Sequence, residues 1–446
     1  MSDRGADVLF VVIDSARKDR LSTYGHDRET TPALDRLAER ATVYENAYAP
    51  APWTLPTHGS LFTGLHPSEH GMTNGFADRT PRMPGDVSTL AERLSERGYR
   101  TAGFSNNPWV GGLTGLDRGF DEFVEWDLQI GRSSDPSLHG TRGRLYSRAH
   151  TLLGHANRQP LVLLKRRFFT SALVDRARTW LGRTGADRPA FTFLNLMEAH
   201  SPYYPPDWAF DRLGLEPPGP LEARLLNTRL LAYVMGKTAL TDRQRVMEFY
   251  DASLRYQDAK VDELLGALAA DGRLDETLVI VCADHGKTLG EFDRDAEPPH
   301  YLYDINVNVP LLVKWPGQTE SRRVEAPFEL TRLFDAALGE RPDPTDAALV
   351  EDFLPHTGRS ADEVTRWRAL ADGEGTYVRS EDGSEHRLVG EAERQSVADD
   401  PESIRTARDA LDGRVETLSS PDRDVEFDDD LDAEVEAQLA DLGYLE

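Results

Sequence analysis

Residues 53 to 64 read WTLPTHGSLFTG, which places a hydroxyl, a proline and an imidazole at two-residue intervals, at Thr54, Pro56 and His58. A threonine at the start of a helix can serve as the N-cap by accepting a backbone hydrogen bond. It can also act as a nucleophile when a base or a metal ion activates its hydroxyl. Both interpretations fit this stretch alone, so residues elsewhere in the chain must decide between them.

Carboxylates follow two strongly apolar segments. Asp14 ends the run VVID, and Asp284 with His285 follows the run TLVIVCA. A carboxylate at the end of a buried strand costs free energy unless it is paired or bound to a metal ion. An adjacent carboxylate and imidazole are typical ligands of a divalent metal, and Gly286 permits a sharp turn after them. The alternative for Asp14 is an N-cap of the helix that follows.

Two further histidines stand in loops beside apolar segments. His200 lies in NLMEAHSPYYPP, and His300 lies in PPHYLYD. A single histidine in such a place is usually structural. The set as a whole points to chemistry, because the hydroxyl, the carboxylates and the imidazoles all fall near strand ends or helix starts. Together they predict a catalytic centre rather than five unrelated structural roles.

Four short apolar runs, rich in β-branched residues, must position these side chains. They span residues 8–13, 190–196, 277–283 and 309–315, and their continuous hydrophobicity is typical of strands buried on both faces. Helical patterns lie between them; one begins at Thr89 with Glu92 as its capping box. Another carries leucine and valine at helical spacing over residues 254–268. We predict an α/β domain with a mostly parallel sheet and a site at the carboxyl ends of its strands.

From about residue 364 the pattern changes to short strands separated by turns. The turn signals are the Asp-Gly pairs at 372–373 and 382–383, which favour an antiparallel sheet. Residues 399–446 hold 17 acidic and 4 basic residues and end in a short amphipathic pattern. We therefore predict a catalytic domain over residues 1–345 and a small C-terminal α+β subdomain with an acidic tail over residues 346–446.

The composition is strongly acidic. The chain has 446 residues, 39% of them hydrophobic, which is enough for a large core. Its formal net charge is −26, and only six of its 51 basic residues are lysine. Such a composition is typical of proteins adapted to high salt and repels nucleic acid. We predict a halophilic protein without a nucleic-acid partner.

Cys282 is the single cysteine, so no intrachain disulfide can form. The apolar run ADVLFVVI near the start is too short to span a bilayer, and no basic region precedes it. We expect a cytoplasmic protein.

One segment opposes the overall charge. Residues 139–183 contain ten arginines and lysines and one acidic residue, Asp175, together with the run LVLLKRRFF. One interpretation is a basic helical insertion that contacts a membrane surface or covers an anionic substrate. The other is an arginine-rich face that pairs with the acidic tail.

Taken together, the motifs resemble those of the sulfatase family of the alkaline phosphatase superfamily. VVIDSARKDRLSTYG resembles the family's first metal-binding segment, and TLPTHGSLFTGLHPSEHGMTNGF its nucleophile segment. GYRTAGFSNNPW, HSPYYPP, DHGKTLGE and HYLYDINVNVPLLVKWPG follow in the family's order, and LADLGYLE is a familiar ending. The resemblance implies an alkaline-phosphatase-like sandwich, with helices on both sides of a central sheet.

The resemblance also implies roles for individual residues. One divalent cation (Ca, Mn, Mg or Zn) is expected to bind Asp14, Thr54, Asp284 and His285. Thr54 stands at the position of the family's nucleophile. The other implied site residues are the acid or base candidates His200 and His300, the substrate-binding candidates Asn74 and Asn106, and His58 in place of the family's arginine.

Three departures from the family pattern affect the expected chemistry. Sulfatases usually carry Cys or Ser, which is oxidised to formylglycine, where this chain has Thr54, so no formylglycine is expected. Asn106 and Pro108 replace a lysine and a histidine of the sulfate site, and Ser15 replaces a second aspartate. Without an aldehyde hydrate, a threonine ester must be cleaved by water at sulfur or phosphorus, as superfamily members do at phosphorus. We therefore favour phosphate mono- or diesters as substrates over sulfate esters.

The sequence thus predicts a metal-dependent hydrolase of a sulfate or phosphate ester. The substrate would be a small-molecule, glycan or lipid-head-group ester. One alternative is a transferase that passes a phospho-head group to another alcohol. The other is a non-catalytic protein that binds anions, which the loss of the family's cysteine and arginine favours.

Overall fold

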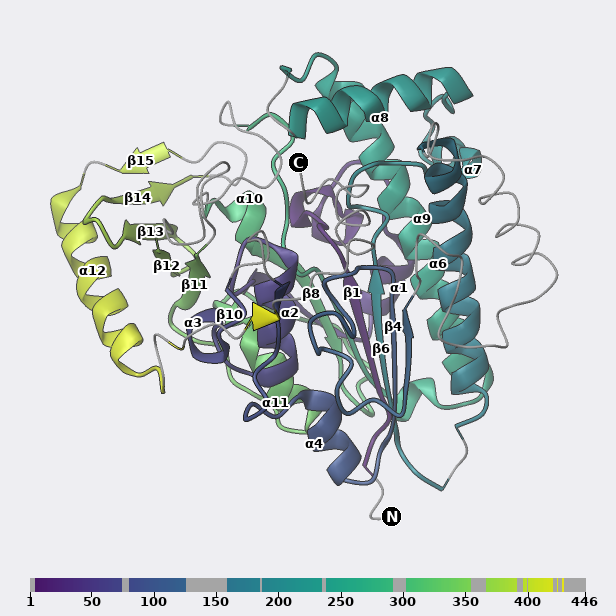
Figure 1. The fold of residues 1–446 in the computed structure, drawn as a ribbon, viewed down its shortest axis with the longest axis horizontal. Coiled ribbons are helices and arrows are strands. Elements are labelled where there is room, and N and C mark those ends of the chain that lie inside the picture. Colours follow the sequence, from purple (N-terminus) through teal and green to yellow (C-terminus); the bar gives the residue numbers. More distant parts are fainter. Residues whose placement is uncertain are drawn as a thin grey trace.

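A central β-sheet with helices on both of its faces forms the larger part of the molecule (Figure 1). The computed structural model describes residues 5–73, 80–125, 159–184, 187–234, 238–291, 302–353, 366–390, 396–398, 400–419, 423 and 427–428. Residues 139–158 of the basic segment and the end of the acidic tail lie outside the described residues, as do Asn74 and His300.

Nine strands of the described chain form the central sheet. Their order across the sheet is β10 (Phe328–Glu329), β2 (Thr42–Tyr48), β8 (Asn308–Lys314), β7 (Leu278–Cys282), β1 (Val8–Ile13), β6 (Ala190–Leu196), β4 (Arg100–Ser105) and β5 (Glu122–Glu125), with β9 (Arg322–Val324) paired to β2. All neighbours pair in parallel except β8, which runs antiparallel to both β7 and β2. The predicted mostly parallel sheet is confirmed.

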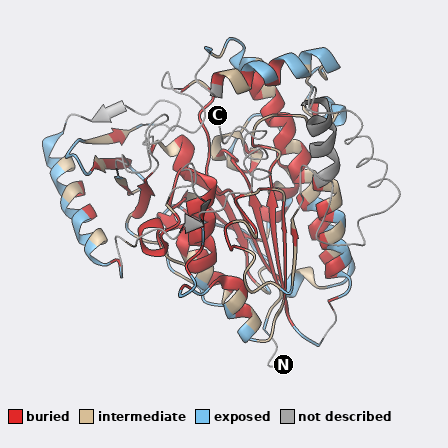
Figure 2. Cartoon of the chain, viewed as in Figure 1, coloured by how far each residue is buried: buried red, intermediate tan, exposed pale blue. Residues whose placement is uncertain are grey.

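The four apolar runs of the sequence form four of these strands. Every residue of β1, β6, β7 and β8 is buried, as Figure 2 shows by the red colour of the sheet. Short apolar runs of this kind become central strands because both faces of the sheet are covered by helices.

Helices cover both sides of the sheet. In Figure 1, α6, α7 and α9 lie on one side, and α2, α4 and α11 lie on the other. The helices have the following bounds: α1 (Pro32–Ala38), α2 (Thr54–Thr63), α3 (Pro67–His70), α4 (Leu90–Glu96), α6 (Gln159–Leu181), α7 (Asp207–Arg212), α8 (Pro220–Val234), α9 (Arg243–Ala270), α10 (Asp304–Val307), α11 (Leu333–Ala337) and α12 (Pro401–Glu416). The predicted capping box of α4 is present, because Thr89 Oγ1 accepts from the backbone N–H of Glu92 and the Glu92 carboxylate accepts from that of Thr89.

A second, antiparallel sheet lies beside the first and is covered by α12 (Figure 1). It contains β11 (Ala348–Asp352), β12 (Trp367–Ala371), β13 (Gly375–Ser380), β14 (Glu385–Val389) and β15 (Ser396–Ala398). Gly373 and Gly383 adopt positive φ angles of 85° and 90° between these strands. Both predicted Asp-Gly turns are therefore confirmed. A separate short pair joins β3 (Thr80–Pro81) to β16 (Phe427–Asp428).

Buried glutamates join the two sheets. The Glu351 carboxylate on β11 accepts from the backbone N–H of Ser68 and from Arg368, each at 2.8 Å. The Glu329 carboxylate accepts a hydrogen bond from Arg414 of α12. The Glu69 carboxylate accepts one from the backbone N–H of Ser419 at 2.8 Å. The bonds of Ser68, Glu329 and Glu69 cross the proposed division at residue 345, which stays a prediction.

None of the helices, as far as their residues are described, has the length and apolar character needed to cross a membrane.

Candidate active site

The register of the parallel strands brings the two predicted acidic ligands together. The ladder between β1 and β7 ends at the pair Val12 and Cys282. Asp14 and Asp284 each lie two residues beyond that pair, at the carboxyl end of the sheet where α/β proteins bind ligands. Both side chains are completely buried.

Neutral hydrogen-bond donors orient the carboxylate of Asp14. The hydroxyl of Ser15 donates to Oδ1 at 2.9 Å, and Nδ2 of Asn107 donates to Oδ2 at 2.8 Å. Asp14 caps no helix: the short 3₁₀ turn after it, Lys18–Arg20, has Arg17 at its N-cap position and no side-chain cap. The N-cap interpretation of Asp14 is therefore wrong.

Ser15 has an unusual backbone. Its φ angle of 58° lies in the left-handed region, which costs a non-glycine residue about 1–2 kcal/mol. The conformation lets its N–H donate to Oδ1 of Asp284 at 2.9 Å, while its carbonyl accepts from the hydroxyl of Tyr250 at 2.8 Å. Ser15 thus connects Asp14, Asp284 and α9.

In the described part of the chain, this network leaves one carboxylate oxygen of Asp284 without a hydrogen bond. Oδ1 accepts from the backbone N–H groups of Ser15 and His285, both at 2.9 Å. Oδ2 is buried and has no hydrogen-bond partner among the described residues. A buried carboxylate oxygen in this state is costly without a cation, so the orphaned atom fits a metal ligand.

His285 presents one ring nitrogen to the same place. Its Nδ1 lies 2.6 Å from the carbonyl oxygen of Gly286, which can only accept, so Nδ1 carries the proton and Nε2 the lone pair. This arrangement is typical of metal-binding histidines. A Cβ atom on Gly286 would lie 2.0 Å from the carbonyl oxygen of Ile305. The close approach of α10 therefore requires glycine there, whereas the φ angle of Gly286 does not, since it lies outside the left-handed region.

Thr54 lies beside this pair and caps no helix. Trp53 occupies the N-cap position of α2, and Thr54 is the first helical residue. Its Oγ1 is 3.3 Å from Nε2 of His285 and is almost completely buried. The N-cap interpretation is wrong, and the expected meeting of this hydroxyl with the Asp284–His285 couple is found.

The cluster has the composition and the spacing of a metal site. Asp14, Asp284 and His285 each offer a ligand atom, and these atoms lie within 4.8 Å of one another. Burial and the negative charge of Asp14 raise the pKa of Asp284 to about 7. Burial also opposes ionisation of Asp14, but the neighbouring His200 and His285 hold its pKa below the ordinary value. A divalent cation between two such carboxylates favours both charged forms.

His58 faces the site from the second turn of α2. Its Nδ1 lies 2.9 Å from the carbonyl oxygen of Thr54, and its Nε2 lies 3.0 Å from Nδ2 of Asn195. Its Nδ1 is also 3.7 Å from Oδ2 of Asp284, beyond hydrogen-bond distance. Burial lowers the pKa of His58 to about 4, so the ring is neutral near pH 7.

His200 reaches the same centre from the loop after β6. Its Nδ1 lies 2.7 Å from the carbonyl oxygen of Ser201, which places the proton on Nδ1 and the lone pair on Nε2. The side chain is 5% exposed, and its nearness lowers the pKa of Asp14.

Asn106 points toward α6. Its Nδ2 lies 3.3 Å from Oγ1 of Thr170, while its Oδ1 is buried without a partner among the described residues. Its predicted contact with substrate oxygens stays a prediction, as do the roles of Asn74 and His300.

Two residues that contact the site were missed from the sequence. Asn107 donates to Asp14, and Asn195 contacts His58. Lys287, two residues after His285, is also buried, with its ammonium group 6.0 Å from the ring centre of Tyr203.

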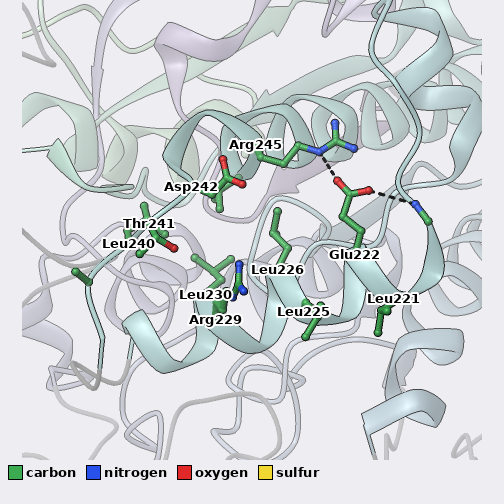
Figure 3. A pocket seen from close by; sticks show the side chains of 13 residues that line it. Leu221, Glu222, Leu225, Leu226, Arg229, Leu230, Leu240, Thr241, Asp242 and Arg245 are labelled. Carbon is green, nitrogen blue, oxygen red and sulfur yellow. Dashed lines mark hydrogen bonds and ion pairs between the residues drawn. The ribbon is translucent and has the colours of Figure 1, made fainter.

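The cavity shown in Figure 3 lies elsewhere. It has a volume of about 480 Å³ and is formed by α8 and the start of α9, with Leu226, Leu230 and Val246 in its wall. None of the predicted site residues lines it.

Known proteins resemble the chain over most of its length. The family model described as Sulfatase matches residues 6–339. An arylsulfatase of Clostridium perfringens is 23% identical over 428 residues, covering 86% of this chain and 83% of that protein. An ulvan-active sulfatase of Formosa agariphila is 24% identical over 406 residues, covering 84% and 73%. Among solved structures, the phosphonate monoester hydrolase of Agrobacterium radiobacter superposes with a TM-score of 0.67 at 18% identity, covering 92% and 95% of the two chains.

Proposed function

The chain belongs to the sulfatase family of ester hydrolases, and from that premise we propose that it hydrolyses phosphate mono- or diesters with Thr54 as the nucleophile and one divalent cation as cofactor. Sulfate esters are the second substrate class. Family membership accounts for hydrolysis of an ester, and the local geometry supports the choice of nucleophile.

The observation that carries the proposal is the position of the Thr54 hydroxyl. Its Oγ1 lies 3.3 Å from the metal-facing nitrogen of His285, and the orphaned Oδ2 of Asp284 lies 3.6 Å from the same nitrogen. Three groups from two distant segments therefore surround one point.

Asp14, Asp284, His285 and Thr54 would hold the cation. When bound, it lowers the pKa of the threonine hydroxyl and neutralises negative charge on the ester oxygens. The protein's own contribution is to hold these ligands in place before the substrate arrives. Ser15 and Asn107 do so by fixing both oxygens of Asp14.

The reaction requires two displacements. Thr54 Oγ1 attacks phosphorus, and the bond to the leaving alkoxide breaks. A threonine side chain cannot regenerate an aldehyde, so water must then attack phosphorus and release the hydroxyl. His200 in its doubly protonated form would donate the Nε2 proton to the leaving alkoxide, because Ser201 holds its other nitrogen.

Thr54 supports the preference for phosphorus, because it cannot regenerate the aldehyde through which formylglycine enzymes release sulfate. Asn106 stands where the family has lysine, and His58, neutral near pH 7, stands where it has arginine. The likeness in fold to a phosphonate monoester hydrolase is consistent with this preference. A small-molecule, glycan or lipid-head-group ester remains the proposed substrate class.

A panel of nitrophenyl phosphate, phosphodiester, phosphonate and sulfate esters, assayed at high salt with Mn, Mg, Ca or Zn, tests the proposal. We expect the highest kcat/KM on a phosphorus ester, loss of turnover in Thr54→Ala, and partial activity in Thr54→Ser. Near-normal turnover in Thr54→Ala would contradict it. Products that carry an added alcohol would instead indicate the transferase, and metal binding without turnover of any ester would indicate the binding protein.

A further inference from the structure

We propose that Asn195 is a positioning residue, which orients the ring of His58 and through it the pose of Thr54. This inference rests on the proposed role of Thr54 as the nucleophile. It adds a residue that contacts neither the predicted metal ligands nor the predicted nucleophile directly.

Asn195 lies in the centre of the sheet. It belongs to β6, where it pairs with Val12 of β1 and Ser105 of β4, and it is completely buried. Its Nδ2 is 3.0 Å from Nε2 of His58, whose Nδ1 is 2.9 Å from the carbonyl oxygen of Thr54. The three groups form a continuous chain from the sheet to the first turn of α2.

The chemistry of the two ends determines the state of the imidazole between them. A carbonyl oxygen only accepts, so Nδ1 of His58 must carry the proton. The amide nitrogen of Asn195 only donates, so Nε2 must accept. Both conditions are met by one neutral tautomer. The other tautomer would direct the Nδ1 lone pair against the Thr54 carbonyl oxygen.

The imidazole ring of His58 has little room to rotate. Phe62 and Phe193 contact it edge-on, with ring centres 6.5 Å and 6.1 Å away. The position of Asn195 costs free energy, because its Oδ1 is buried without a hydrogen-bond partner among the described residues. An apolar residue of similar size would avoid that cost, so the part of Asn195 that serves the site is its N–H donor.

The consequence for the reaction is geometric. The Thr54 carbonyl belongs to the same residue as the attacking hydroxyl, and a misplacement of about 1 Å can slow an enzyme about 100-fold. Loss of the Asn195 donor should therefore reduce kcat and leave KM nearly unchanged, because no contact with the substrate is removed.

The first experiment compares Asn195→Ala with Thr192→Val in the metal-loaded enzyme. Thr192 is a buried residue of the same strand, three positions away, and points to the opposite face. We expect kcat to fall about 10- to 100-fold in Asn195→Ala, with KM changed less than about twofold, and Thr192→Val to stay near wild type. Equal losses in both variants, or a change confined to KM, would overturn the proposal.

A double-mutant cycle separates positioning from general packing. If Asn195 acts through His58, adding Asn195→Ala to His58→Ala should lower kcat no further, because the connection is already broken. Additive losses would show that Asn195 supports the site independently of His58 and would contradict the inference.

Nitrogen NMR of histidine-labelled protein gives a readout that needs no turnover. We expect His58, assigned with His58→Gln, to show a protonated Nδ1 and an unprotonated Nε2 near neutral pH. Asn195→Ala should shift the Nε2 resonance of this ring, because that nitrogen loses its hydrogen-bond donor. An unchanged ring would refute the proposal even if Thr54 is the nucleophile, whereas a shifted ring with full activity in Thr54→Ala would refute only the proposed function.

Discussion

Thr54 and His285 are 231 positions apart in the chain, yet their side chains meet at 3.3 Å in a fully buried place. Beside them, neutral donors from Ser15 and Asn107 orient the carboxylates of Asp14 and Asp284. These groups leave one carboxylate oxygen, Oδ2 of Asp284, without a partner among the described residues. Under the proposed function, this oxygen is a ligand of the cation.

Replacing that carboxylate should remove metal-dependent stability. A ligand at about 100 times its Kd stabilises the folded state by about 2.7 kcal/mol. We expect added Mn or Ca to raise the Tm of the wild-type protein and of the exposed control Asp175→Asn, but not that of Asp284→Asn. A metal-induced rise in Asp284→Asn equal to that of the wild type would place the cation elsewhere.

The buried His70 should make stability fall in acid. Its Nδ1 accepts from the backbone N–H of Met72 and its Nε2 contacts Ser60, both at 3.0 Å, and burial lowers its pKa to about 3. Because the folded pKa lies below the unfolded value of about 6.5, the neutral ring contributes stability above that value. This stability is lost as pH falls toward 3, at about 1.4 kcal/mol per pH unit.

Urea unfolding of the wild type and His70→Gln measures this contribution. The difference between the two free energies of unfolding above pH 6.5 is the baseline. One pH unit below 6.5, the free energy of unfolding of the wild type should have fallen by about 1 kcal/mol more than that of the variant. Parallel pH curves for the two proteins would contradict the assignment.

The sequence singled out side chains whose chemistry is distinctive, and their catalytic and metal-binding roles stay predictions. Asp14, Asp284, His285 and Thr54 stood at strand ends or a helix start, in the order of a known family, and the structure brings them together. Asn107 and Asn195 could not be predicted. An asparagine has no chemistry that marks it in a sequence, and its role here depends on which distant strands become neighbours.

Among strands and helices, apolar runs were sufficient to locate the four central strands. The pattern did not reveal that β8 runs antiparallel, because direction in a fully covered sheet leaves no trace in hydrophobicity. Nor could it reveal the connection between the sheets, which depends on buried glutamates whose partners lie up to hundreds of residues away.

That connection yields a stability prediction. Glu351→Ala removes a buried acceptor from both Ser68 and Arg368 and should cost about 3 kcal/mol in the free energy of unfolding. The exposed Glu374→Ala on the same sheet should stay within about 0.5 kcal/mol of wild type. Equal urea midpoints for the two variants would contradict a structural role of Glu351.

Across the whole chain, the net charge of −26 should make stability depend on salt. Screening is weak at about 0.1 M and strong at about 1 M, where the Debye length falls from about 10 Å to about 3 Å. We expect the Tm to rise between these KCl concentrations as repulsion among acidic side chains is screened. A flat or falling Tm, with sucrose as a non-ionic control, would argue against a halophilic protein.

The division of the molecule into two sheets was predictable from the change in pattern near residue 364, and the antiparallel pairing of β12, β13 and β14 confirms it. The substrate could not be predicted, because loops around the candidate active site determine it and their residues follow no periodic pattern. The chemistry at the centre can nevertheless be tested without knowing the natural substrate.

The most direct test is mass spectrometry of the metal-loaded enzyme, quenched with acid during turnover of an activated phosphate ester. Our account predicts a phosphoryl group on the peptide that contains Thr54, present with substrate and absent in Thr54→Ala. Turnover with an unmodified Thr54, or a phosphoryl group on another residue, would contradict it.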